Sequence, residues 1–372
     1  MSSEREFRIA LDARFLREKY SGIGAHIKGL LTGFSKVELP SSLKFTIFGP
    51  PFVQRFLPKK ENFQFLECST PPLRLKEHWE IPRLLRDRNI SLFHVPHFNA
   101  PFFWRGKLIV TIHDLTPLRF PQQYSPAARA YFQIMVRRAS RRAEAVFAVS
   151  RFTAQSLIEM EIPGEKIRVI YNGVEPPPEA PPERERTFLE KYNLRDYLLY
   201  CGNVRFHKNV ALLVRLIREL QKSFPSLKLV IAGAVDPDYQ EFQLELSKTD
   251  PELVLLLGYV SSEELGALYK NALLFLFPSL SEGFGIPPLE AMSFGLPVLA
   301  SNCASLPEVL GDAALLLPPD DLNAWVEGVK SLLLNTSSRQ SLKDKGLQRW
   351  RMFSWENTAR SILKEYERLK CA

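Results

Sequence analysis

Two glutamates and two basic residues in the second half of the chain could together bind a ligand that carries both hydroxyls and phosphates. Glu282 and Glu290 are separated by seven residues, and Arg205 and Lys208 by two. Carboxylates accept strong hydrogen bonds from hydroxyls, whereas Arg offers forked hydrogen bonds and Lys a movable point charge to phosphate oxygens. Such a set suits a sugar and a ribose on either side of a diphosphate that gains charge as it leaves.

The local sequence predicts how the glutamates are positioned. Residues 273–277 form a short apolar run, typical of a strand covered on both faces. Pro287 and Pro288 suit a first helical turn, which lacks amide partners, and Glu290 is expected in that turn. The loop 281–285 is therefore expected where a strand ends and a helix begins, a place where α/β sheets bind ligands and helix amides attract anions.

The segment SEGFGIPPLEAMSFGLPVLAS, residues 281–301, closely resembles the E-x7-E segment of retaining glycosyltransferases of family 4, which have the GT-B fold. The resemblance implies that Glu282 holds the donor sugar and Glu290 the nucleotide ribose. It also assigns donor-binding roles to the residues between them, namely Gly283, Phe284, Gly285 and Ile286. Spacing alone leaves an alternative open, in which the pair is an acidic loop residue and a glutamate favoured by the helix dipole.

Two further segments of the second half resemble the same family. GNVRFHKN, after an expected strand at 197–201, is similar to the family segment whose basic pair binds the donor diphosphate, which implies this role for Arg205 and Lys208. The resemblance also puts the nucleotide base against the turn that contains Tyr259 and Val260. A capping box, formed by a serine and a glutamate three residues later, is expected to start the next helix.

The pair Asp236 and Asp238 forms a D-x-D pattern, which binds divalent metal in the other major glycosyltransferase fold. The proline between them favours a turn instead. We therefore expect no metal site, and no cofactor other than the nucleoside diphosphate sugar that serves as substrate.

The first half alternates apolar strands with helices, which predicts a parallel sheet. Between the first strand and a helix near residue 23, Gly22 and Gly24 are expected in an anion-binding loop, as in family 4; an ordinary flexible turn is the alternative. Strand ends deliver His97 and His113, the latter beside Asp114. We favour His113 with Asp114 for sugar hydroxyls or proton sharing, and place His97 on the acceptor side, although a lone histidine is more often structural.

Charge divides the chain unequally. Residues 1–180 contain 27 Lys and Arg against 17 Asp and Glu, and the remainder contains 22 against 24. A basic first half suits an anionic lipid surface, a phosphorylated acceptor or nucleic acid, or serves solubility alone. The expected helix at 125–145 ends in Arg137, Arg138, Arg141 and Arg142, with Tyr131, Phe132, Ile134 and Met135 as a candidate apolar face. One interpretation is that the helix dipole favours basic residues at this C-terminal end. The more specific interpretation is that the helix contacts an anionic membrane surface.

The alternation of strands and helices predicts an α/β protein, and the resemblance to family 4 implies the GT-B fold, with two Rossmann-like, doubly wound domains facing a cleft. Expected boundaries are 1–175 for the first domain, 176–187 for a proline-rich linker, 188–353 for the nucleotide-sugar domain and 354–372 for a helix that crosses back. The implied activity is retaining, metal-independent transfer of a hexose, preferably from GDP-mannose, to a saccharide or lipid-linked acceptor. A UDP-sugar donor and a non-catalytic nucleotide- or glycan-binding protein are the alternatives.

No nucleic-acid partner is expected, because no recognised module or aromatic-rich basic surface is evident. Residues 1–13 lack the apolar core of a signal peptide, and no apolar run is long enough to span a membrane. We therefore expect a cytoplasmic protein that makes, at most, peripheral contact with the inner face of the membrane.

Overall fold

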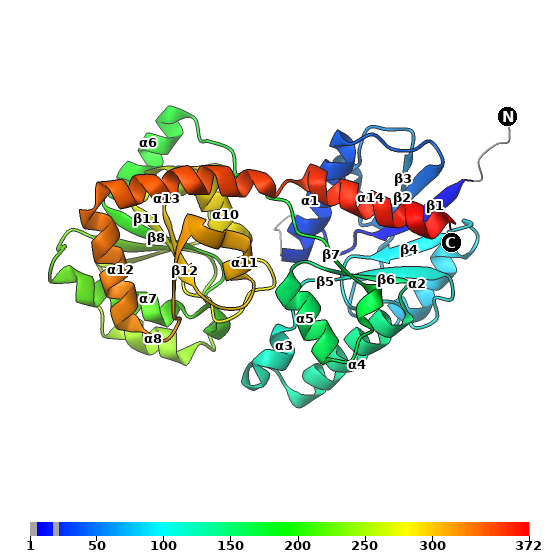
Figure 1. The fold of residues 1–372 in the computed structure, drawn as a ribbon, viewed down its shortest axis with the longest axis horizontal. Helices are drawn as coiled ribbons and strands as arrows, with labels where there is room; N and C mark the ends of the chain where they lie inside the picture. Colours follow the sequence, from blue (N-terminus) through cyan, green and yellow to red (C-terminus); the bar gives the residue numbers. More distant parts are fainter. Residues whose placement is uncertain (1–5, 18–21, 372) are drawn as a thin grey trace. The chain divides into compact units, whose positions relative to one another are not determined.

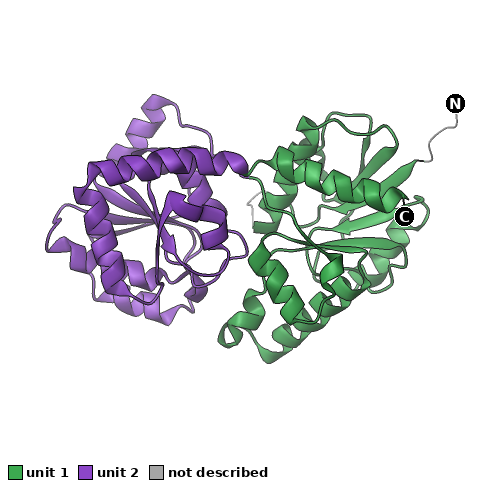
Figure 2. Ribbon diagram, viewed as in Figure 1, with its two compact units in different colours: residues 1–173, 353–372 green, residues 174–352 purple. Residues whose placement is uncertain are grey.

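The protein, described from a computed structural model, consists of two compact α/β units (Figures 1 and 2). The structure describes residues 6–17 and 22–371. Unit 1 comprises residues 1–173 and 353–372, and unit 2 comprises residues 174–352. Each unit contains one sheet with parallel strands and its own helices.

Unit 1 contains, among the residues described, a seven-stranded parallel sheet in the order β3-β2-β1-β4-β5-β6-β7. All seven strands expected from the sequence form. They are β1 (Phe7–Asp12), β2 (Leu43–Gly49), β3 (Phe63–Glu67), β4 (Leu92–Val95), β5 (Lys107–Ile112), β6 (Ala145–Ala148) and β7 (Ile167–Val169). The helices are α1 (Gly22–Lys36), α2 (Glu77–Arg86), α3 (Thr116–Arg119), α4 (Pro126–Arg142), α5 (Arg151–Glu159) and α14 (Trp355–Cys371).

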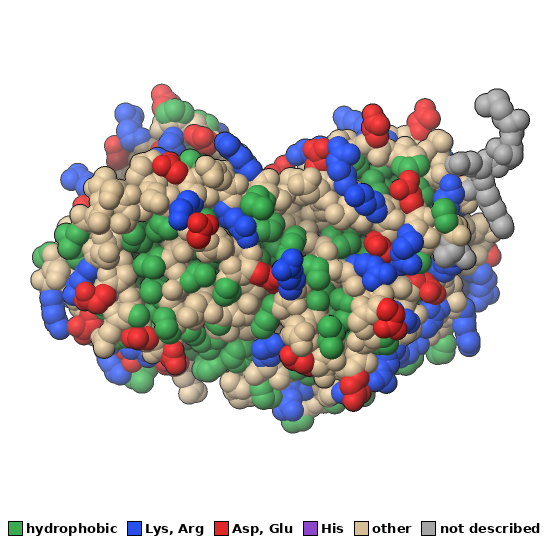
Figure 3. All heavy atoms as spheres, viewed as in Figure 1, with side chains coloured by type: hydrophobic (Ala, Val, Ile, Leu, Met, Phe, Trp, Pro, Cys, Tyr) green, Lys and Arg blue, Asp and Glu red, His purple; other side chains and the backbone are tan. Residues whose placement is uncertain are grey.

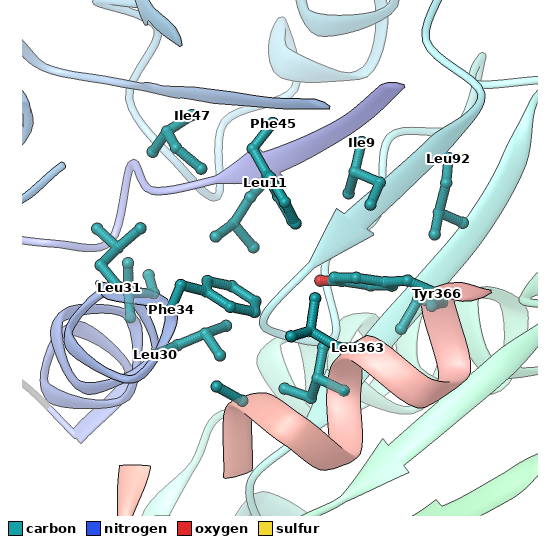
Figure 4. Packing of buried hydrophobic residues seen from close by; sticks show 14 of the residues in the cluster. Ile9, Leu11, Leu30, Leu31, Phe34, Phe45, Ile47, Leu92, Leu363 and Tyr366 are labelled. Carbon is teal, nitrogen blue, oxygen red and sulfur yellow. The ribbon is translucent and has the colours of Figure 1, made fainter. Parts of the chain in front are cut away.

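The sheet of unit 1 is covered on both faces, because successive strand residues point to opposite sides. Ile9 and Leu11 of β1 face the layer formed by α1 and α14, whereas Ala10 faces the layer formed by α2, α4 and α5. Figure 4 shows Tyr366 and Leu363 of α14 packed with residues of α1 and of the central strands. The last helix of the chain is therefore part of the core of the first unit.

Small residues let α14 approach closely. A Cβ atom at Gly33 of α1 would lie 2.2 Å from the backbone oxygen of Trp355, and one at Gly29 would overlap the indole of Trp355. At Gly173, where the chain leaves unit 1, a Cβ atom would lie 2.1 Å from the backbone nitrogen of Trp355. The chain thus leaves and re-enters unit 1 at adjoining points.

Unit 2 contains, in the described residues, a six-stranded parallel sheet in the order β10-β9-β8-β11-β12-β13. Its strands are β8 (Tyr197–Cys201), β9 (Lys228–Ala232), β10 (Val254–Gly258), β11 (Leu274–Phe277), β12 (Val298–Ser301) and β13 (Ala314–Leu317). Of these strands, β13 was not expected from the sequence. The helices are α6 (Pro182–Lys191), α7 (Val210–Gln221), α8 (Gln240–Ser247), α9 (Ser262–Asn271), α10 (Ile286–Ser293), α11 (Leu306–Leu310), α12 (Leu322–Leu334) and α13 (Thr336–Arg349).

The proline-rich segment is shorter than expected. An extended connector was expected over residues 176–187, but α6 begins at Pro182, so this expectation is wrong for the second half of the segment. Proline is well tolerated in a first helical turn because its missing N–H would have no intrahelical partner there. Prolines therefore begin a helix at this point rather than prevent one.

None of the described helices has the length and apolarity that a membrane span requires.

We expect Gly33→Ala to destabilise the protein, because the added methyl group meets backbone atoms of Trp355 that cannot rotate away. The free energy of unfolding should fall by about 1–3 kcal/mol, as for other overpacked sites. At Gly22 in the same helix, no described heavy atom beyond the chain neighbours lies within 4 Å of an added Cβ, so Gly22→Ala should be neutral or stabilising by up to about 1 kcal/mol. Urea denaturation measures both, and equal stabilities would contradict this account of α14 docking.

Candidate functional site

The candidate site of unit 2 lies at the carboxyl ends of β8 and β11, which are neighbours in the sheet. The chain runs from β8 to β9 and β10 on one side, and then crosses to β11 on the other side of β8. This reversal is the topological switch point at which open α/β sheets bind ligands. Lys208 follows β8 and Glu282 follows β11, so the sheet itself brings the two residues together.

Lys208 and Glu282 form a half-buried ion pair, with Nζ 2.6 Å from Oε1. The Lys208 ammonium also lies 5.8 Å from the centroid of the Phe277 ring. The backbone N–H of Leu280 donates to the carbonyl of His207 at 2.8 Å, which ties the two loops together. The structure thus joins two of the four residues singled out by sequence, in direct contact.

Residues after β12 contact the backbone of the loop that contains Glu282. The buried Ser305 hydroxyl lies 3.0 Å from the carbonyl oxygens of both Glu282 and Phe284, and its single proton can be donated to either. The Cys303 thiol lies 3.3 Å from the carbonyl oxygens of Ser279 and Leu280. These contacts fix the backbone and leave the Glu282 side chain on the side of Lys208. Sequence reasoning missed both residues, since Ser and Cys carry no motif that identifies a backing role.

The loop enters α10 through Gly285, whose φ is +97°, a left-handed conformation that favours glycine. A Cβ atom there would lie 2.7 Å from a Leu306 methyl carbon. The expected strand, loop and helix are confirmed, including both prolines in the first helical turn, but one detail differs. Because Pro287 and Pro288 lack N–H groups, the N–H groups at the helix start that have no intrahelical acceptor belong to Gly285 and Ile286.

The detail that differs is Glu290, which was expected in the first turn of the helix. It is the fifth residue of α10 and therefore lies in the second turn. Tyr269 of α9 donates its hydroxyl to Oε2 of Glu290 at 3.1 Å. Burial raises the pKa of Glu290 to about 7, although the Tyr269 hydrogen bond opposes the shift. Near neutral pH this carboxyl group is poised between its neutral and its charged form.

Arg205 lies at the other end of the turn that contains Lys208, and its own partner is an aspartate. Its Nε atom is 3.5 Å from Oδ2 of Asp236, and its side chain is about half exposed (51%). Asp236 also accepts a hydrogen bond from the backbone N–H of Asp238 at 3.1 Å, so the two aspartates form the turn that their proline suggested. Among the residues described, no group of three or more His, Cys, Asp or Glu is arranged to hold a metal ion.

The turn expected to meet a nucleotide base follows β10. Gly258 has a φ of +64°, Tyr259 is exposed and Val260 is half-buried. The capping box is confirmed, because Ser261 accepts from the Glu264 N–H and the Glu264 carboxylate accepts from the Ser261 N–H. Gly283 and Ile286 are half-buried and Phe284 is buried.

The switch point of unit 1, between β1 and β4, is occupied by the chain's own side chains. Arg14 donates from Nε to Oδ1 of Asp12 at 2.9 Å and from Nη2 to Oδ2 at 2.6 Å, and its Nη2 lies 2.8 Å from Glu77. Asn99 donates to Glu77 and accepts from the Tyr131 hydroxyl. The first four of these residues are buried. Burial alone would raise the pKa of Asp12, but the Arg14 charge prevails and lowers it.

His97 belongs to this buried network. Its Nδ1 accepts from the Asn99 N–H at 2.9 Å, which leaves the proton of the neutral ring on Nε2, 3.6 Å from Oδ2 of Asp12. That distance is too long for a hydrogen bond, so the contact is electrostatic. His97 therefore has structural partners inside unit 1, and its assignment to the acceptor side stays a prediction.

His113 is half-buried at the end of β5, and its Nε2 donates to the Pro96 carbonyl at 2.9 Å. Burial lowers the pKa of His113, which favours a neutral ring whose Nδ1 is an acceptor. The His26 ring stands edge-on to it, 4.7 Å between centroids. Asp114 is exposed, and its Oδ1 accepts from the N–H of Thr116, the first residue of α3. The catalytic roles suggested for this pair stay predictions.

The first glycine loop is only partly visible. Residues 18–21 lie outside the described residues, whereas Gly22 and Gly24 are the first and third residues of α1. The expectation that both glycines belong to a loop is therefore wrong. Gly22 is the exposed first residue of the helix, and Gly24 is buried within it.

Comparison with known proteins agrees with this geometry. Residues 48–176 match the family described as Glycosyltransferase Family 4, and residues 182–349 match Glycosyl transferases group 1. The O-antigen chain mannosyltransferase B of Escherichia coli is 32% identical over 295 residues, which cover 77% of this chain and 76% of that protein. The chain therefore belongs to glycosyltransferase family 4, and it is a glycosyltransferase.

Solved structures confirm the GT-B fold class. Sucrose-phosphate synthase from Thermosynechococcus elongatus superimposes with a TM-score of 0.78 at 19% identity and covers 98% of this chain and 99% of its own. Anabaena Alr3699/HepE in complex with UDP-glucose gives a TM-score of 0.76 at 15% identity, with coverage of 97% and 100%. The expected fold of two Rossmann-like units is thus confirmed.

The raised pKa of Glu290 predicts a pH-dependent stability. In the folded state its pKa is about 7, against a usual value of 4.5, so folding takes up a proton between these values. The contribution of the protonated Glu290 to the stability of the folded state is complete below the pKa that the group has in the unfolded chain. This contribution is lost as pH rises through the pKa of the folded state. Between about pH 5 and about pH 8 the free energy of unfolding of the wild type should decrease. In Glu290→Gln, which has no carboxyl group to titrate here, this decrease should be smaller by about 1–3 kcal/mol. Denaturation at several pH values measures this difference.

Glu252→Gln, at an exposed carboxylate, is the matched control and should keep the wild-type slope. An unchanged slope in Glu290→Gln would show that this carboxyl group titrates normally.

Proposed function

We propose that this glycosyltransferase is a retaining hexosyltransferase that takes a hexose from a nucleoside diphosphate donor, preferably GDP-mannose. The acceptor is a hydroxyl of a saccharide or a lipid-linked glycan. The observation that supports the proposal most directly is the Lys208–Glu282 pair at the switch point of unit 2. The pair brings the cation that we assign to the diphosphate into contact with the carboxylate that we assign to the sugar.

The proposed step occurs on one face of the sugar. The bond between the anomeric carbon and the diphosphate oxygen breaks, and its electron pair stays on that oxygen. The acceptor hydroxyl oxygen forms the new bond to the same face of the carbon, and its proton passes to the departing phosphate oxygen. Lys208 and Arg205 stabilise the charge that develops on the diphosphate, aided by the amides of Gly283, Gly285 and Ile286.

The two glutamates divide the remaining contacts. Glu282 orients the sugar hydroxyls, and Glu290 accepts from the ribose, with Tyr259 and Val260 beside the base. The proposal needs no metal, because Arg205 and Lys208 supply two positive charges and Asp236 is already paired with Arg205. In unit 1, His113 and Asp114 are assigned to the sugar, and His97 to support of the acceptor side.

Two specific alternatives are retained. A UDP-sugar donor is favoured by the fold-level likeness to a protein solved with UDP-glucose, whereas GDP-mannose is favoured by the likeness to an O-antigen mannosyltransferase. A protein that binds the nucleotide or glycan without turnover is the other alternative. Thermal stabilisation by GDP-, UDP- and ADP-sugars distinguishes the donors, since a ligand that binds the folded state alone raises its stability.

We expect Lys208→Ala to lower turnover more than donor affinity, because the ammonium matters most when charge develops on the leaving diphosphate. Loss of such a contact is expected to raise the activation free energy by about 2–4 kcal/mol. Steady-state kinetics with GDP-mannose and UDP-glucose measure the effect. Lys222→Ala, at an exposed lysine paired with Glu219, is the control.

The same assay is run with EDTA. Turnover that is unaffected by Lys208→Ala would contradict the role of this residue. Activity lost in EDTA and restored by Mn²⁺ would contradict the metal-free part of the proposal.

Glu290→Gln should weaken both the free nucleoside diphosphate and the intact donor, each by about 1.5–3 kcal/mol, because both carry the ribose. Glu282→Gln should weaken only the donor. Since Lys208 would lose its carboxylate partner, free GDP should bind Glu282→Gln as well as or better than the wild type. Calorimetric titration with GDP and GDP-mannose, and with UDP and UDP-glucose, separates the two. Equal weakening of the bare nucleotide by both variants would rule out this division of roles.

A further inference from the structure

Unit 1 carries a cluster of exposed apolar side chains that the proposed function does not use. Three segments supply it, and we call it the apolar patch: Leu73, Leu75, Trp79, Phe102, Phe103 and Ile134. Scattered exposed hydrophobic residues are ordinary on protein surfaces, whereas large ones gathered in one place mark an interaction site.

Contacts between the segments show that the patch is continuous. The backbone N–H of Phe103 donates to the carbonyl of His78 at 3.4 Å, and the Phe102 ring meets the His78 ring at 4.9 Å, so this loop lies against the start of α2. Arg138 of α4 places its guanidinium 3.7 Å from the Phe102 ring centroid and donates to the Phe102 carbonyl at 2.6 Å. Ile134 lies one helical turn before Arg138.

Hydrogen bonds below the apolar patch connect the segments that form it. The buried Glu77, two residues before Trp79, accepts from the buried Asn99, and Asn99 accepts from the half-buried Tyr131 of α4. These hydrogen bonds join the same three segments below the exposed side chains. Leu73 has a φ of +61°, a conformation that bulky residues rarely adopt. The exposed side chains therefore project from a fixed base.

The surroundings of the patch are strongly basic. Residues 71–88, 98–107 and 126–142 contain twelve Lys and Arg against three acidic residues, one of which is the buried Glu77. On the face in view in Figure 3, Lys and Arg side chains recur along the margin of unit 1 near α4. Of the residues named for the candidate apolar face of this helix, Phe132 and Met135 are buried inside unit 1, whereas Ile134 is exposed.

We infer that the apolar patch docks unit 1 on the surface of an anionic lipid bilayer. Trp79 and the two phenylalanines suit the headgroup level, where aromatic rings combine an apolar body with a polar edge. The surrounding Arg and Lys side chains contact anionic headgroups. An anionic bilayer surface carries such headgroups over its whole area, so it complements the basic residues on every side of the patch. This inference does not depend on the donor or on the reaction.

The test uses the full chain and vesicles of phosphatidylcholine, with or without a quarter of phosphatidylglycerol. Flotation should show binding to the anionic vesicles at least about tenfold stronger than to neutral ones, and weaker at high salt. The variant Leu75→Ser/Phe103→Ser should lose binding by about tenfold or more. The control variant Leu244→Ser/Leu334→Ser changes two leucines of unit 2 that are 54% and 76% exposed, whereas Leu75 and Phe103 are 73% and 58% exposed. It should bind as the wild type does.

Tryptophan fluorescence tests insertion directly. Brominated acyl chains should quench the signal of Trp79, and Trp79→Phe should lose most of that quenching. Absence of binding to anionic vesicles, or equal binding by the patch variant and the control variant, would overturn the inference. Self-association that the patch variant abolishes, without vesicle binding, would instead identify a second copy of the chain as the occupant.

Discussion

The ion pair between Lys208 and Glu282 is the contact around which the candidate site of unit 2 is arranged. Two flexible side chains of opposite charge meet because β8 and β11 are neighbours and end at the same edge of the sheet. The hydrogen bond from Leu280 to His207 and the Ser305 hydroxyl fix the backbone on which they meet. A ligand that carries both phosphates and hydroxyls can replace this contact on both sides, because it offers an anion to the lysine and donors to the glutamate.

Unit 1 uses the same sheet geometry differently. Its switch point is filled by a buried network centred on Asp12 and Arg14, so polar groups that could face a ligand there bind one another. A buried ion pair of this kind is costly to break, since each partner would be left as an uncompensated charge. The network therefore sets the positions of the loops after β1 and β4, and His113 at the end of β5 lies outside it.

The sequence predicted much of the fold and part of the site. Strand and helix positions follow from local patterns, and the E-x7-E segment carries its own loop glycine and helix prolines, so Glu282 was placed correctly relative to both. Glu290 was misplaced by one turn, because the helix start depends on the left-handed Gly285 and not on the prolines alone. Ser305, Tyr269 and the Asp12 network could not be predicted, since their roles exist only once residues far apart in sequence are packed together.

The return of α14 to unit 1 could be expected only from the family resemblance, because no local pattern in the helix itself shows it. Its residues Tyr366 and Leu363 belong to the core of unit 1, and Tyr366 is hydrogen-bonded to the buried His94 at 2.6 Å. Unit 1 thus cannot complete its core until the chain has passed through the whole of unit 2. Because the chain leaves at Gly173 and returns at the adjoining Trp355, unit 2 is an insertion at a single point of unit 1. The glycines at this point are therefore required by close backbone approach, and a side chain at Gly173 would disturb both connections at once.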